Sequence, residues 1–212
     1  MPADGPPQQV RICVSPDCGV RFPAPEGYAD ERGCPLCDAP TTGDRELVNY
    51  APSITTTSSS LTLAGLVDNV RSAANVGSMI RTADAVAMSP IFLCGITATP
   101  KHRGVTKASL GAEHSVEWSQ RPNAVLLADE LLADGWTLIA LESTPHAIGP
   151  SELLTASLPQ KLVLIAGHEV AGVDPDLQDR AGYHLSLPML GLKESLNVSV
   201  AFGIAAHMLR SH

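Results

Sequence analysis

The sequence lacks the apolar segments that would place a protein in a membrane. No apolar run reaches the roughly 20 residues that a membrane-spanning helix needs. Residues 1–9 contain neither the basic start nor the apolar stretch of a signal peptide. We therefore expect a cytoplasmic protein that does not contact the membrane.

Positive charge is also scarce. The chain has 14 Lys and Arg residues against 22 Asp and Glu residues, which gives a net charge of −8. This balance argues against a broad electrostatic grip on nucleic acid, and we expect no DNA partner. One local basic cluster stands out, although taken alone it is more typical of a solvated helix face; it consists of Lys101, His102, Arg103 and Lys107.

The residues that are present predict a folded protein. Hydrophobic residues make up 44% of the chain and charged residues 17%, which is typical of globular and not of disordered chains. A length of 212 residues is enough for one good core and a small appendage. A nucleotide-dependent dehydrogenase is disfavoured, because no Gly-x-Gly-x-x-Gly run follows the first expected strand.

Four of the five cysteines form two closely spaced pairs near the N-terminus. Cys13 and Cys18 are separated by four residues, Cys34 and Cys37 by two, and fifteen residues lie between the pairs. This pattern predicts a four-thiolate zinc ribbon within residues 1–40, although the first pair is wider than the commonest spacing. So short a unit could hardly fold without the metal. The alternative is two disulfides, which a cytosolic setting disfavours.

A polar, Pro/Ser/Thr-rich stretch over residues 41–60 is interpreted as a linker, and an α/β domain follows over residues 61–212. Continuous apolar runs predict strands of a parallel sheet that is covered on both faces. We expect about six strands, over residues 61–67, 91–94, 115–118, 137–141, 162–166 and 183–187. Helices are expected over residues 73–87, 101–110 and 123–134 and from residue 195 onward. Cys94 lies on one of the strands and is expected in the core.

Ligands of such sheets bind beyond the carboxyl ends of the strands, and polar residues follow two of the strands there. Asn75 and Arg81 are close to two helical turns apart, so that one could orient the other. A Gly-x-Glu-x-x-Gly run over residues 167–172 directly follows a buried strand. Gly167 allows a tight turn, and it lets a ligand approach the backbone closely. Glu169 is the charged residue of this run.

The last stretch of the chain is a third junction of this kind. Pro188 and Gly191 break regular structure, and Ser195 is expected to cap the helix that follows. A loop that leads into a helix N-terminus with small polar residues suits an anionic or polar ligand. The alternative is an ordinary buried helix, whose apolar residues recur at Leu196, Val200, Ile204 and Met208.

The three junctions together resemble motifs 1, 2 and 3 of the SpoU (TrmH) family of RNA ribose 2′-O-methyltransferases, in the SPOUT superfamily. The resemblance spans about residues 61–210, in order and at the expected separations. It implies a deep trefoil-knotted α/β domain, S-adenosylmethionine as the cofactor, and tRNA or rRNA as the substrate. It also implies a homodimer with the C-terminal helix in the interface.

The resemblance further implies a role for individual residues. The cofactor would be held around Gly167, Leu187, Met189 and Leu196, with Ser195 nearby. The reacting ribose would lie at Arg81, supported by Asn75, and the centre would be completed by Glu169, Ser195 and Asn197. Arg81 could hold the adjacent phosphate and orient the hydroxyl. A role as the proton acceptor is less secure, because arginine stays protonated.

Other interpretations of the same fold stay open. A catalytically weak RNA-binding or ribosome-assembly factor is one, although the intact polar residues argue against it. A methyltransferase that acts on a base nitrogen is another, and Arg81 with the Ser-Leu-Asn run favours ribose chemistry instead. Neither the modified nucleotide nor the partner of the cysteine-rich unit, RNA or protein, can be read from the sequence.

Overall fold

A computed structural model describes residues 7–47 and 61–211. The chain divides into two compact units, residues 1–57 and 58–212, called the N-terminal and C-terminal units below. No helix in the described residues is both long and apolar enough to cross a bilayer.

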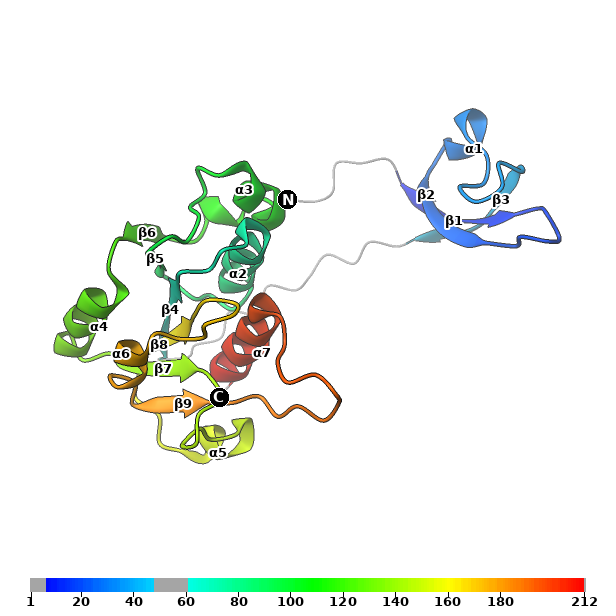
Figure 1. The fold of residues 1–212 in the computed structure, drawn as a ribbon. Coiled ribbons are helices and arrows are strands. Elements are labelled where there is room, and N and C mark those ends of the chain that lie inside the picture. Colours follow the sequence, from blue (N-terminus) through cyan, green and yellow to red (C-terminus); the bar gives the residue numbers. More distant parts are fainter. Residues whose placement is uncertain (1–6, 48–60, 212) are drawn as a thin grey trace. The chain divides into compact units, whose positions relative to one another are not determined.

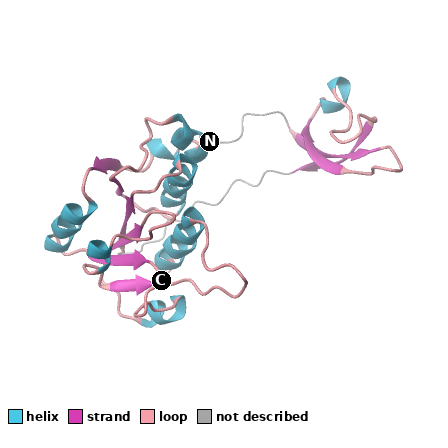
Figure 2. Ribbon diagram, in the orientation of Figure 1, coloured by secondary structure: helices cyan, strands magenta, loops and turns pink. Residues whose placement is uncertain are grey.

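The N-terminal unit is a small antiparallel sheet with the strand order β2-β1-β3. Its strands are β1 (Gln8–Cys13), β2 (Arg21–Pro25) and β3 (Thr41–Leu47), and α1 (Tyr28–Glu31) follows β2 (Figure 2). Strand β3 corrects the predicted linker, because residues 41–47 pair with β1 and belong to this unit. The sequence did not predict this strand because six of its seven residues are exposed, so it lacks an apolar pattern. The rest of the predicted linker, residues 48–60, lies outside the described residues.

The C-terminal unit is built on a six-stranded, all-parallel sheet with the order β6-β5-β4-β8-β7-β9 (Figure 1). Its strands are β4 (Thr62–Asp68), β5 (Ile91–Cys94), β6 (Trp118–Arg121), β7 (Thr137–Leu141), β8 (Lys161–Ala166) and β9 (Tyr183–Leu185). Its helices are α2 (Ala73–Ala85), α3 (Arg103–Ser109), α4 (Ala124–Ala133), α5 (Pro150–Thr155), α6 (Pro175–Gln178) and α7 (Val198–Arg210). The predicted fold class, an α/β domain with six strands, is confirmed.

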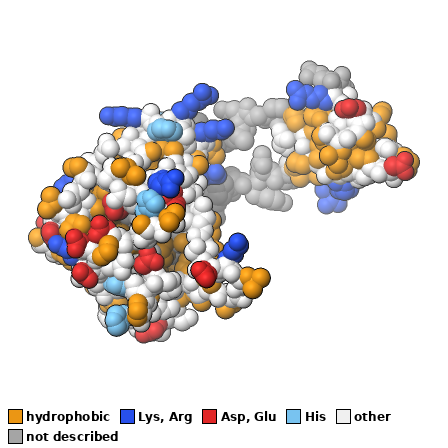
Figure 3. Space-filling model, viewed as in Figure 1, with side chains coloured by type: hydrophobic (Ala, Val, Ile, Leu, Met, Phe, Trp, Pro, Cys, Tyr) orange, Lys and Arg blue, Asp and Glu red, His pale blue; other side chains and the backbone are white. Residues whose placement is uncertain are grey.

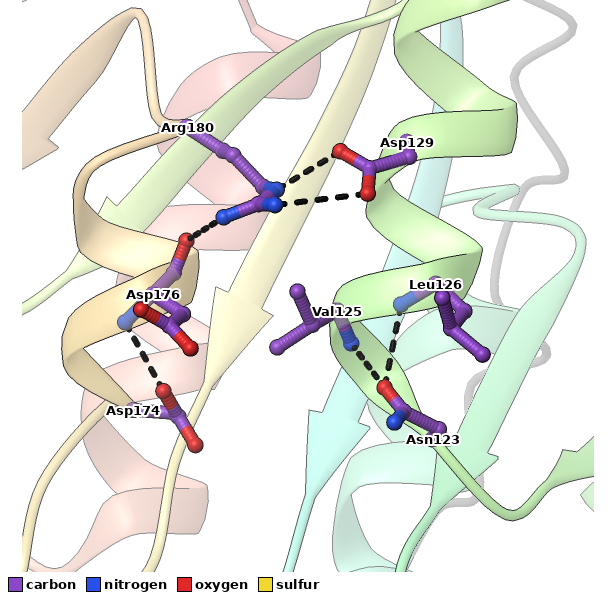
Figure 4. Close-up of polar contacts among 7 residues, drawn as sticks. All are labelled: Asn123, Val125, Leu126, Asp129, Asp174, Asp176 and Arg180. Atoms are coloured by element: carbon purple, nitrogen blue, oxygen red, sulfur yellow. Dashed lines mark hydrogen bonds and ion pairs between the residues drawn. The ribbon is translucent and has the colours of Figure 1, made fainter.

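Two hydrophobic cores, one on each face of the sheet, explain why its strands are so apolar. Helices α2, α3, α5 and α7 contribute to one core, and α4 and α6 to the other. Cys94 is fully buried in the second core, as predicted. On that face Arg180 joins α6 to α4, since it donates to both carboxylate oxygens of Asp129 and to the carbonyl oxygen of Asp176 (Figure 4).

Two predicted elements begin three residues later than expected. The strand expected over residues 115–118 begins only at Trp118, because a 3-10 helix at Ala112–His114 and the turn after it occupy the preceding residues. The C-terminal helix begins at Val198, and its cap is Asn197 instead of Ser195. The Asn197 side chain accepts hydrogen bonds from the backbone N–H groups of Ser199 (2.8 Å) and Val200 (3.4 Å).

The buried face of α7 also differs from the apolar repeat that the sequence emphasised. Phe202, Ala205, Ala206 and Leu209 pack into the core, whereas Val200 and Ile204 are 49% and 46% exposed. The helix therefore carries apolar residues on two faces, of which the described residues cover only one.

Candidate active site

A pocket of about 570 Å³ opens at the carboxyl ends of β7, β8 and β9. Most of its lining comes from three segments: residues 141–145 after β7, residues 167–172 after β8, and parts of residues 185–201 that lead into α7. The course of these segments can be followed in Figure 1. The structure brings together all the residues that were predicted to bind the cofactor, namely Gly167, Leu187, Met189, Ser195 and Leu196.

The loop after β8 is closed on itself. His168 N–H donates to the carbonyl oxygen of Gly172 (3.0 Å), and Gly172 N–H donates to that of His168 (2.9 Å). A methyl group at Gly167 would lie 2.2 Å from the Gly172 carbonyl oxygen, so no side chain fits there. Gly167 is therefore needed to close this loop tightly.

Closure of the loop presents Glu169 to the start of α2. Its carboxylate accepts the backbone N–H groups of Arg71 and Ser72, each at 2.9 Å, and the side-chain amide of Asn75 at 3.1 Å. Partial burial raises the pKa of Glu169, but these hydrogen bonds outweigh it and lower the pKa to about 2. Glu169 is therefore an anion at neutral pH and acts as a hydrogen-bond acceptor, not as a proton donor.

Replacing Glu169 with Gln is expected to remove a pH-dependent part of the stability. Because the native pKa of about 2 lies below the ordinary value of 4.5, the carboxylate stabilises the folded state at neutral pH. This contribution is lost as the pH falls from about 4.5 toward 2. The melting temperature of the wild type should exceed that of Glu169→Gln at pH 7, and the difference should shrink below about pH 5. A difference that does not change with pH would contradict this role.

Asn75 connects all three junctions. While its amide nitrogen donates to Glu169, its oxygen accepts from the amide nitrogen of Asn197 at 3.1 Å and lies 3.5 Å from the Ser199 hydroxyl. The three residues Asn75, Glu169 and Asn197 come from α2, the loop after β8 and the cap of α7, and they form one continuous hydrogen-bonded network at the rim of the pocket.

Arg81 lies outside this network. It is exposed on α2 and makes no hydrogen bond or ion pair with the described residues. The expectation that Asn75 orients Arg81 directly is not met, since the Asn75 amide is engaged by Glu169 and Asn197. The pocket lining includes Ser195 and Asn197 but neither Arg81 nor Asn75.

The charge of the pocket favours a cationic ligand over an anion. Three carboxylates line it, from Glu142, Glu169 and Glu194, and the lining contains no Lys or Arg among the described residues. Apolar side chains such as Leu141 and Leu187 supply surface for a ring. The volume is typical of a small-molecule site. This arrangement fits S-adenosylmethionine, which combines a flat base with a positive sulfonium.

Comparison with known proteins supports the same reading. The model of the SpoU rRNA Methylase family matches residues 63–207, well over half of the chain. The chain belongs to this SpoU family. A Bacillus subtilis 23S rRNA (guanosine(2553)-2′-O)-methyltransferase is 33% identical over 145 residues, which cover 68% of this chain and 56% of that protein. A tRNA (guanosine(18)-2′-O)-methyltransferase of Borreliella burgdorferi is 24% identical and is covered to 65%. This chain thus spans somewhat over half of the length of these relatives.

Solved structures of SpoU proteins share the fold. An AdoMet-bound rRNA methyltransferase from Sinorhizobium meliloti superposes with a TM-score of 0.62 at 26% identity, over 71% of this chain and 56% of that one. The TrmH/SpoU tRNA modifying enzyme of A. aeolicus gives a TM-score of 0.63 at 26% identity, over 70% and 74% of the two chains.

Sequence reasoning missed part of this SpoU pocket. Glu142, Ser143 and Thr144 directly follow the buried strand β7 and line the pocket. The Glu142 carboxylate accepts the N–H groups of Ser143 (3.0 Å) and Val173 (2.9 Å), and the second of these bonds holds the far end of the loop after β8. The signal was present in the sequence, because polar residues directly after a buried strand had identified the other junctions.

The SpoU match does not include the N-terminal unit, where the four predicted metal ligands come together. The Sγ atoms of Cys13, Cys18, Cys34 and Cys37 all lie within 4.8 Å of one another, and none of these cysteines forms a disulfide. The Cys13–Cys37 and Cys18–Cys34 sulfur pairs are 3.5 and 3.7 Å apart. Tetrahedral zinc with Zn–S bonds of about 2.3 Å would separate its sulfurs by about 3.8 Å. The four thiols could therefore hold such an ion.

Proposed function

We propose that this SpoU family protein methylates a ribose 2′-hydroxyl of tRNA or rRNA. The observation that carries the proposal is the hydrogen-bonded network of Asn75, Glu169 and Asn197 at the rim of an acidic pocket. Polar groups from three separate segments meet where a cofactor and a substrate would meet. The names of the relatives, rRNA and tRNA 2′-O-methyltransferases, support the same reaction.

S-Adenosylmethionine is the proposed cofactor and would supply the methyl group. Leu187, Met189 and Leu196 would contact its base, and the backbone at Gly167 would approach it closely. Glu169 and Ser195 would face the region of the sulfonium. The network holds Asn197 in place, so the pocket and the cap of α7 stay aligned. Catalysis would depend mainly on positioning, because the positive charge disappears during transfer.

Arg81 is proposed to act on the RNA and not on the cofactor. Its guanidinium is exposed and unpaired among the described residues, so it is free to bind a phosphate beside the reacting ribose. Holding that phosphate would orient the 2′-hydroxyl toward the methyl carbon.

The test is transfer of labelled methyl groups into RNA from a strain that lacks the gene, followed by nucleoside analysis. A labelled 2′-O-methylnucleoside in tRNA or in rRNA is the expected result and would identify the substrate class. Label in a base would contradict ribose chemistry. Cofactor binding without transfer would favour the assembly-factor alternative.

We also propose that the protein is a homodimer that buries the exposed face of α7. Val200, Ile204 and Met208 line a groove next to Thr82, the residue that follows Arg81. Exposed apolar side chains that gather in one groove are typical of a protein interface. A partner on this groove would therefore lie beside Arg81. The trefoil knot of the SPOUT fold stays a prediction.

Ile204→Asp is expected to convert the dimer into a monomer, since it would bury an unpaired charge in the interface. The mass in solution, measured by light scattering during gel filtration, should fall by half. Leu126→Asp is a matched control, because Leu126 is an exposed apolar residue on α4, over the opposite face of the sheet. A dimer that survives Ile204→Asp would contradict this interface.

For the cysteine cluster we propose a structural zinc ion in a reducing compartment such as the cytoplasm. The buried apolar residues of the described N-terminal unit are only Cys13, Ala24 and Cys34. Such a core is too small to stabilise a unit of this size, and the metal would supply the missing free energy.

A further inference from the structure

One stretch of the C-terminal unit carries a net positive charge, while the rest of that unit is acidic. Residues 71–112 hold five Lys or Arg residues and one Asp, a net charge of +4. Residues 113–212 hold five Lys or Arg residues and twelve Asp or Glu residues, a net charge of −7. The overall negative charge therefore hides one basic region, whose cations are Arg71, Arg81, Lys101, Arg103 and Lys107.

Within the part of the chain that the structure describes, these five cations make no side-chain contacts with partners, unlike several other cations in the same unit. Arg121 pairs with Glu130, Arg180 pairs with Asp129, and Arg210 donates to three backbone carbonyl oxygens. The five side chains of the basic region are exposed and make no ion pair or hydrogen bond with the described residues. Their charge is therefore available to a ligand.

The basic region is held rigidly beside the active site. At Gly77 of α2 an added methyl group would lie 2.4 Å from the carbonyl oxygen of Val105, so α3 packs directly on the α2 backbone. The start of α2 is bound to the pocket through the two backbone N–H groups that Glu169 accepts. In Figure 3 blue side chains gather at the edge of this unit where Figure 1 places α3.

Helix α3 presents two of these cations on one exposed face. The His102 side chain caps the helix by accepting the N–H group of Gly104 at 3.0 Å. Arg103 and Lys107 are then four residues apart and share one exposed face, and Lys101 directly precedes the cap. Exposed cations on a packed element can neutralise phosphates of a nucleic-acid backbone.

We propose that the phosphate backbone of the RNA substrate lies across α3, on Lys101, Arg103 and Lys107, and reaches the pocket along the start of α2. That this surface binds RNA rests on the function proposed above. The N-terminal unit is a poor alternative for this contact, because residues 1–47 hold four Arg residues and eight Asp or Glu residues. RNA would therefore be recruited by the SpoU domain itself.

The test is the combined variant Lys101→Gln, Arg103→Gln and Lys107→Gln. The affinity for bulk tRNA and for purified rRNA is measured by fluorescence anisotropy as a function of salt. The slope of log affinity against log salt should become shallower by about 2 to 3, since each phosphate contact contributes roughly 0.7 to 0.9. The KM for RNA should rise at least about tenfold, with unchanged kcat and unchanged S-adenosylmethionine affinity.

A control removes three exposed charges elsewhere: Arg32→Gln, Arg45→Gln and Lys161→Gln, of which Lys161 also donates to the carbonyl oxygen of Asp134. It should leave the slope nearly unchanged. An unaltered slope in the α3 variant, or an equal change in the control, would overturn this inference while leaving the methyltransferase activity established. A wild-type protein that neither binds nor methylates RNA would instead overturn the proposed function, and this inference with it.

Discussion

Arg81→Ala is expected to reduce methyl transfer to RNA by at least about 100-fold, the cost of losing the alignment of a reacting group. The affinity for S-adenosylmethionine should stay unchanged, because Arg81 does not line the pocket. Stability should also change little, since the side chain is exposed and makes no hydrogen bond or ion pair with the described residues. The effect should therefore fall on catalysis alone.

Single-turnover transfer of labelled methyl groups measures the first effect, and calorimetric titration with the cofactor measures the second. Arg81→Lys is the informative companion variant, because it keeps the charge but loses the planar fork that binds a phosphate through two hydrogen bonds. It should retain only a small part of the activity. A fully active Arg81→Ala protein would remove Arg81 from the mechanism.

Removal of zinc is expected to unfold the N-terminal unit. Structural zinc contributes about 10 to 16 kcal/mol of apparent binding free energy in small zinc domains, more than a core of this size can replace. Purified protein should contain one zinc per chain. A strong chelator, or the variant Cys34→Ser with Cys37→Ser, should abolish both the metal and the hydrogen-exchange protection of residues 8–47.

Cys94 provides the control for this experiment. It is buried in the core of the C-terminal unit, so Cys94→Ala should keep the zinc content at one per chain. The melting of the C-terminal unit should not respond to the chelator, because its two cores contain no metal ligand of the cluster. Protein that is free of zinc but still protected over residues 8–47 would contradict a structural metal.

Local patterns were enough to predict most of the secondary structure. The strands of a parallel sheet that is covered on both faces must be apolar throughout, so β7 and β8 could be recognised as continuous runs. Cysteine spacing likewise predicted a four-thiol cluster, because each ligand pair lies within one short turn. Strand β3 was missed for the opposite reason, since it lies in a small sheet and exposes nearly all of its side chains.

The sequence by itself also identified polar residues that follow buried strands, but only the tertiary structure decided how they are connected. Glu169 finds its partners 94 to 98 residues earlier in the chain, and Asn197 meets Asn75 across 122 residues. The cap of α7 is Asn197 and not the predicted Ser195. The Asn197 side chain accepts hydrogen bonds from the helix N–H groups and also joins this network. Hydrogen bonds and electrostatic interactions depend on distances in space. A linear pattern can therefore predict which residues reach the edge of the sheet. Their partners, the negative charge of the pocket and the exposure of the α3 cations follow from packing.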